Sequence, residues 1–108
     1  FMLIETGTTT VSTSGTEVQL SSTASKVRWI EITGGRKNKG PVYIGKSTIS
    51  SGDPVAYAGK KIQRHETWSM DIGSLGAADS AYIELNTIYA DAENDGDSIS
   101  WIAIIDAS

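Results

Sequence analysis

The chain contains no cysteine and only one histidine among its 108 residues, and both shortages narrow the chemistry open to it. Without cysteine there is no disulfide, no thiolate metal site and no cysteine nucleophile. His65 alone cannot build a histidine-rich metal site, and no Gly-x-Ser-x-Gly, P-loop or Gly-x-Gly-x-x-Gly motif occurs. We therefore expect a protein that is not an enzyme and carries no cofactor.

Long apolar runs are also missing. The longest uninterrupted run is Trp101–Ile105, five residues, whereas a membrane-spanning helix needs about 20. The first residues, Phe1–Glu5, have no basic region ahead of a long apolar stretch, so we expect no signal peptide. The sequence predicts no membrane partner.

Small hydroxyl side chains are abundant: the chain has 14 serines, 11 threonines and 11 glycines. Hydroxyl and β-branched side chains compete with or crowd a helical backbone and favour strands and turns. No stretch of about a dozen residues places apolar side chains at the spacing of one helix face. Helix should therefore be the minority state.

Alternation of polar and apolar residues predicts several strands. In Thr67–Ile72 we expect Trp68, Met70 and Ile72 to point inward. In Ser98–Ile105 the odd-numbered positions share one apolar face, while Ile102 and Ile104 place apolar groups on the other. In Lys26–Thr33 we expect Val27 and Trp29 on one face and Ile30 and Ile32 on the opposite face. Further strands are expected at residues 16–20, 41–45 with an extension at 48–49, 81–85 and 87–90, and residues 60–64 form a strand or a connector.

Gly, Pro, Ser and Asn separate these strands, with turns expected at residues 51–54, 58–59 and 94–97 and a loop at 73–80. Six to eight short strands of this kind predict an all-β fold with one domain over residues 1–108. The two candidate architectures are an antiparallel β-sandwich and a jelly-roll-like barrel. Residues 1–15, rich in Thr and Ser, should form either an extended N-terminal arm or edge strands.

Charge is divided unevenly along the chain. The segment up to Arg64 holds all nine basic residues and four acidic ones, whereas the rest holds nine acidic residues and no Lys or Arg. One interpretation is that strands of the two halves pair and neutralise each other. The other is that a basic face meets an acidic face of a neighbouring copy. The net charge of −4 argues against a nucleic-acid partner.

The acidic segment Asp91–Asp97 is a candidate calcium loop, because Asp91, Glu93, Asp95 and Asp97 alternate around a glycine. An EF-hand is excluded, since its twelfth position would be Ile102 instead of a glutamate and its flanks would be strands. An irregular calcium site and an acidic, solvated hairpin tip remain the two interpretations. We predict no dependence of folding on metal.

The three tryptophans, Trp29, Trp68 and Trp101, could stack on sugar rings if they lay together on the surface. Each one lies within an apolar strand pattern, which favours burial in the core or in a subunit contact. Buried or subunit-facing indoles would support a structural protein. Coplanar exposed indoles would support a carbohydrate-binding module.

The order of the elements resembles that of small all-β bacteriophage virion proteins, the capsid decoration (cement) proteins and related head or tail appendage proteins. The residues that carry this resemblance run over most of the chain: Thr16–Leu20, Val27–Ile32, Gly40–Gly45, Ser47–Ser50, Gly59, Thr87–Asp91 and Ile99–Ile104. The resemblance implies a structural virion protein on the capsid surface that binds the major capsid protein and stabilises the phage head. It also implies association in threes.

Apolar residues on both faces of two strands independently predict self-association, because a sandwich buries only one face of each sheet. The opposing interpretation is a monomer whose extra apolar face is covered by the N-terminal arm. The alternative function is a carbohydrate-binding β-sandwich module of a head or tail appendage. We expect subunit or capsid contacts at six residues: Arg28, Trp29, Tyr43, Trp101, Ile102 and Ile104.

Overall fold

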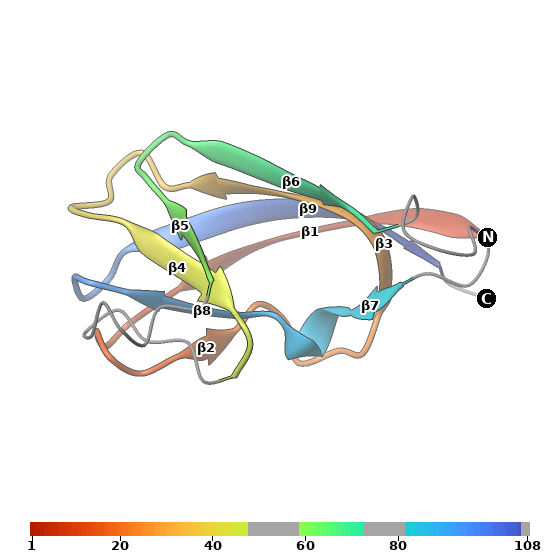
Figure 1. Cartoon of the computed structure of the whole chain (residues 1–108), viewed down its shortest axis with the longest axis horizontal. Helices are drawn as coiled ribbons and strands as arrows, with labels where there is room; N and C mark the ends of the chain where they lie inside the picture. The colour runs from red at the N-terminus through yellow and green to blue at the C-terminus, as the bar shows by residue number, and fades with distance from the viewer. Residues whose placement is uncertain (48–58, 73–81, 107–108) are drawn as a thin grey trace.

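Two antiparallel sheets pack face to face in the computed structural model, which describes residues 1–47, 59–72 and 82–106 (Figure 1). Sheet A has the order β1–β9–β3–β6, with β7 pairing to β3, and sheet B has the order β2–β8–β4–β5. The strands of sheet A are β1 (Met2–Thr10), β3 (Lys26–Gly34), β6 (Thr67–Asp71), β7 (Ile83–Glu84) and β9 (Ser98–Asp106). Those of sheet B are β2 (Val18–Gln19), β4 (Val42–Gly45), β5 (Lys60–Ile62) and β8 (Tyr89–Ala92). A short 3-10 turn, η1 (Leu85–Thr87), precedes β8. The fold is a β-sandwich, as the sequence predicted.

The core lies between the sheets and consists mainly of branched aliphatic side chains. The alternation predicted for β9 is confirmed: Ile99, Trp101, Ala103 and Ile105 are buried, whereas the residues between them are exposed. On β6 the side chains of Trp68 and Met70 are half-buried and pack against the core, and Ile72 beyond it is buried.

The face assignment for β3 was wrong at Val27. Pairing with β9 shifts register between Val27 and Trp29, because Arg28 is an extra residue that β9 does not match. A β-bulge of this kind lets two neighbouring positions oppose one residue of the partner strand. Val27 therefore joins Ile30 in the core, while Trp29 turns to the outer face of sheet A.

The N-terminal segment forms an edge strand and is not a free arm. All nine residues of β1 pair antiparallel with β9, from Met2 opposite Asp106 to Thr10 opposite Ser98. Because β1 lies in the plane of sheet A, it does not cover the outer face of β9. Ile102 and Ile104 keep 38% and 37% of their surface exposed, so the described residues leave this apolar face open.

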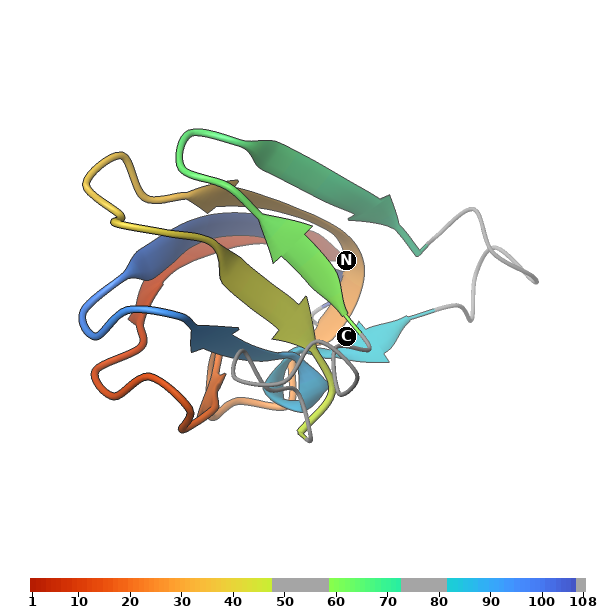
Figure 2. The same ribbon diagram turned by 60° about the vertical axis from the view of Figure 1, so that its left-hand side comes forward.

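The predicted turn at residues 94–97 is present, and Gly96 has the positive φ of +85° that favours glycine. It does not close a hairpin, however. It connects β8 in sheet B to β9 in sheet A, so the chain crosses from one sheet to the other there (Figure 2). The N-terminus lies at the opposite end of the sandwich from this turn (Figure 1).

Several sequence predictions fall outside the described residues: the extension at 48–49, the turn at 51–54, residue 58 of the turn at 58–59, the loop at 73–80 and the start of the strand at 81–85. Within the part of the chain that the structure describes, no helix has the length and apolarity needed to cross a membrane.

Candidate functional site: the outer face of sheet A

Four apolar side chains form a patch on the outer face of sheet A, at the end where β1 begins and β9 ends. Ile104 lies between Ile4 of β1 and Trp29 of β3 in the strand register, and Ile102 follows two residues away on β9. Ile4 is 70% exposed, and Trp29 is half-buried. Side chains directly opposite on neighbouring strands lie within contact distance. We call these four residues the apolar patch.

Beyond the patch the same face becomes polar. Hydroxyl groups meet across the strands: Thr8 Oγ1 lies 3.5 Å from Ser100 Oγ, and Thr33 Oγ1 lies 3.0 Å from Thr67 Oγ1. A shallow hollow of about 160 Å³ lies between the two halves of the face, lined by Glu31, Thr33, Ser100, Trp101 and Ile102. The face therefore has an apolar half and a polar half rich in hydrogen-bonding groups.

The structure brings three of the six predicted contact residues together: Trp29, Ile102 and Ile104. Arg28 lies next to them at the bulge, and its guanidinium is 3.9 Å from the carboxylate of Asp106. Ile4 was not predicted, because its position beside Ile104 depends on the register of β1, which the sequence does not give.

Tyr43 and Trp101 lie elsewhere. Tyr43 is on β4 in sheet B, is only 4% exposed, and donates a hydrogen bond of 3.2 Å from its hydroxyl to Glu93. Trp101 is 6% exposed and faces the core. Both side chains are therefore almost fully covered by the chain itself.

The three tryptophans do not form one exposed surface. Only Trp29 faces outward from sheet A, whereas Trp101 is buried and Trp68 packs against the core from β6. A row of coplanar indoles, the arrangement that would favour sugar stacking, is therefore absent.

The carboxylates of the candidate calcium loop bind backbone amides. Asp97 accepts hydrogen bonds of 3.0 Å from both Lys39 N and Gly40 N, one on each oxygen. Asp91, which is fully buried, accepts from Gly15 N at 3.0 Å. Over residues 1–47, 59–72 and 82–106 no group of three or more His, Asp or Glu side chains is placed to hold a metal ion. Asp91 and Asp97 are buried and fasten neighbouring loops, whereas Glu93 and Asp95 are exposed, so the solvated-tip interpretation holds only for the middle of the segment.

Opposite charges from the two halves of the chain meet within sheet A. Lys26 of β3 lies opposite Glu84 of β7, and Arg28 pairs with Asp106 of β9. The contact between Arg28 and Asp106 agrees with the neutralising interpretation of the charge division. Contact between faces of neighbouring copies stays a prediction.

No family model matches the chain, and no curated protein matches it either.

Proposed function

We propose that the protein is a structural virion protein, a capsid decoration (cement) subunit that binds the major capsid protein through the outer face of sheet A. The observation that carries the proposal is the apolar patch. Ile102 and Ile104 lie on the strand whose other face fills the core, and Ile4 and Trp29 extend the patch across three strands. Contiguous exposed apolar side chains on a folded domain favour a protein contact.

The apolar character of the patch supports its use as a docking surface. Covering the exposed part of these four side chains removes apolar surface from water, at about 25 cal/mol per Å² before the entropic cost of association is subtracted. A protein that binds the assembled shell and not its free subunits stabilises the shell by mass action. This mechanism needs no catalytic residue, no cofactor and no nucleic acid.

Self-association fits the same proposal, with three copies on the capsid surface as the resemblance implies. The patch is left uncovered by the described part of the chain, so a second copy or the capsid can cover it. Charged residues at its border, such as Glu31 and Arg28, would orient the contact, while the isoleucines supply most of its stability.

The test uses virions encoded by the same genome as the chain. We expect the protein in purified particles, and we expect electron microscopy to show it as density on the head. Heads stripped of it should rebind the wild-type chain and resist heating better, whereas Ile4→Thr/Ile104→Thr should rebind weakly. Thr10→Ala, exposed at the far end of β1, is the matched control. Particles without the protein would contradict the proposal.

A carbohydrate-binding module is the second candidate, favoured by the hollow that lies next to the patch. Glu31, Thr33 and Ser100 provide hydrogen-bonding groups there, and Trp29 precedes Glu31 by two positions on the same face of β3. Calorimetric titration with a panel of oligosaccharides tests it. Saturable binding abolished by both Trp29→Ala and Glu31→Gln would favour this candidate over the first.

A further inference from the structure

A pocket lies at the end of the sandwich away from the apolar patch, between the β3–β4 and β5–β6 loops. Its volume is about 340 Å³, and its lining consists of Asn38, Lys39, Gly40, Gln63 and Arg64. This volume is at the lower end of the range for small-molecule sites, about 300–1,000 Å³. Figure 2 shows the two loops side by side at one end of the molecule. The neighbouring Ser98 begins β9, and Ile104 lies six residues further along, about 20 Å away in an extended strand.

The lining is polar and carries positive charge only. It contains one lysine, one arginine and two side-chain amides, and no acidic residue. Among the described residues neither Lys39 nor Arg64 has an ion-pair partner. Two cationic side chains that border one concave surface and make no ion pair there favour an anion at that surface.

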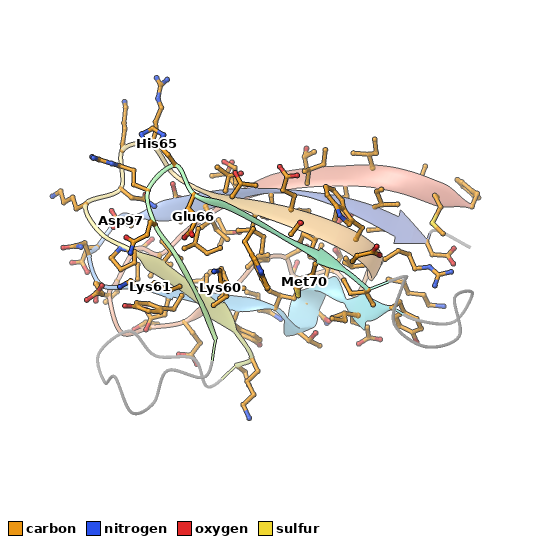
Figure 3. The ribbon with its side chains drawn as sticks, turned by 45° about the horizontal axis from the view of Figure 1, so that its top comes forward. Lys60, Lys61, His65, Glu66, Met70 and Asp97 are labelled. Atoms are coloured by element: carbon orange, nitrogen blue, oxygen red, sulfur yellow. The ribbon has the colours of Figure 1, made fainter. Side chains whose placement is uncertain are left out.

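Two carboxylates border the lining and keep their negative charge, but their oxygens accept hydrogen bonds from backbone amides of the loops and form no ion pair with Lys39 or Arg64 within the described residues. Asp97 uses one oxygen for Lys39 N and the other for Gly40 N. Glu66 accepts a 2.8 Å hydrogen bond from Gln63 N with Oε1. Figure 3 shows Glu66 and Asp97 below the β5–β6 turn, and His65 pointing away from the body of the protein at its tip.

The walls of the pocket are fixed by hydrogen bonds between loops. Asn38 is 4% exposed; its Nδ2 donates to Ser98 O at 2.7 Å, and its Oδ1 accepts from Ser98 N at 2.8 Å. Gly34 joins the other loop, since its nitrogen donates to Glu66 O at 2.9 Å and its oxygen accepts from His65 N at 3.2 Å.

Glycines bring these loops close together. A Cβ at Gly34 would overlap Gln63 O, and a Cβ at Gly40 would lie 2.6 Å from Nδ2 of Asn94. The pocket therefore exists before any ligand arrives, and a site formed in advance loses less conformational entropy on binding.

We propose that this pocket binds the oxyanion group of a small molecule, a phosphate or a carboxylate, between Lys39 and Arg64. The planar guanidinium of Arg64 can donate two parallel hydrogen bonds to such a group, and the ammonium of Lys39 supplies a second, more mobile charge. The side-chain amides of Asn38 and Gln63 border the same space. The amide of Asn38 is hydrogen-bonded to the backbone of Ser98, so this residue forms a wall of the pocket. The amide of Gln63 is an additional polar group for the ligand. The inference does not depend on the capsid proposal.

The test is a titration of the ¹⁵N-labelled full chain followed by NMR, with sodium phosphate in one arm and sodium citrate in the other. Ionic strength is held constant with sodium chloride. We expect saturable shifts confined to the amides of residues 38–40 and 63–64 in at least one arm. Saturation by phosphate identifies a phosphate group as the ligand chemistry, and saturation by citrate identifies a carboxylate. Shifts that do not saturate in either arm would overturn the proposal.

Charge-removing variants test the residues. Arg64→Gln and Lys39→Gln should each weaken binding about tenfold, since each removes a charged donor. Arg64→Lys, which keeps the charge and loses the planar fork, should weaken it by a smaller factor. Lys46→Gln, an exposed cation at the other end of β4, is the control and should bind like the wild type. Lys39 and Arg64 are both exposed, so the melting curves of their variants should coincide with that of the wild type. Equal weakening by Lys46→Gln would show a general charge effect and would overturn the site.

Discussion

Gly7 of β1 and Trp101 of β9 lie directly opposite each other, and a Cβ at position 7 would come within 2.6 Å of Cζ2 of the indole. Trp101 is buried, and its Nε1 has no hydrogen-bond partner among the described residues. The indole is therefore held by shape and not by a polar contact. The glycine makes room for the largest side chain of the core, at the edge strand that closes sheet A.

Gly7→Ala should lower the free energy of unfolding by about 1–3 kcal/mol, because an added methyl group overfills a packed site. Urea unfolding followed by tryptophan fluorescence measures the change. Thr6→Ala is the matched control, since Thr6 is exposed on the same strand, and it should stay within about 0.5 kcal/mol of the wild type.

A double-mutant cycle isolates the contact between these two residues. Trp101→Phe removes the part of the indole that Gly7 accommodates, so Gly7→Ala should be less destabilising in that background. We expect a coupling free energy of about 1 kcal/mol or more. Additive effects would mean that the alanine is destabilising for another reason.

Asp97 fastens the β3–β4 loop through two backbone amides, and this arrangement needs two acceptor oxygens. Asp97→Asn replaces one oxygen with an NH₂ group facing an N–H. We expect a loss of about 1.5–3 kcal/mol, because a buried donor is left without an acceptor. Hydrogen exchange at the amides of Lys39 and Gly40 should also become faster. Glu17→Gln, at an exposed position, is the control, and unchanged exchange in Asp97→Asn would contradict the role assigned to the carboxylate.

The sequence was sufficient for most of the strands and of their faces, because alternation in segments such as β6 and β9 depends only on local side-chain order. It left β1 open between an arm and an edge strand, and it assigned Leu85 and Thr87 to strands although they lie in η1. It was not sufficient for β3, where Val27 and Trp29 are two residues apart and yet face opposite sides. A β-bulge forms where one residue of a strand has no partner residue on the neighbouring strand. Here the two strands, β3 and β9, are far apart in the chain, so the residue pattern of either strand alone cannot show the bulge.

Removing the extra residue of the bulge should therefore disrupt the fold more than removing its side chain. Deletion of Arg28 forces Val27 out of the core or shifts β3 against β9, and we expect a loss of about 3 kcal/mol or more. Arg28→Ala keeps the bulge and removes the side chain together with its contact to Asp106, and we expect a smaller loss of about 1–2 kcal/mol. Urea midpoints compare the two. A deletion as stable as Arg28→Ala would show that the register tolerates the change.

The candidate surfaces, too, could be predicted from the sequence only in part. Ile102 and Ile104 were predicted because apolar side chains on both faces of one strand are visible in the sequence. Ile4 and the pocket at Lys39 and Arg64 were not, since each depends on contacts between segments that are distant in the chain.

Folding should not depend on calcium. Oxygens of Asp91 and Asp97 accept hydrogen bonds from backbone amides, and a calcium ion would have to displace these contacts. We expect the melting temperature in calcium and in chelator to agree within about 1 °C. A chain without calcium ligands gains no stability from the ion, whereas a bound ion stabilises by mass action. A clear fall in melting temperature with chelator would instead restore Asp91, Glu93, Asp95 and Asp97 as candidate ligands.

Self-association in solution should depend on the apolar patch. Ile102→Thr/Ile104→Thr keeps the β-branched shape that suits a strand and removes apolar surface from the exposed face. We expect the wild-type chain to sediment as an oligomer, a trimer under the capsid proposal, and the double variant to associate about tenfold or more weakly. Unfolding of the monomer should change little, because neither side chain is in the core.

Ser100→Ala, exposed on the same face and outside the patch, should associate like the wild type. A wild-type chain that remains monomeric at high micromolar concentration would contradict self-association, and binding of the patch to the capsid would then have to account for its exposure.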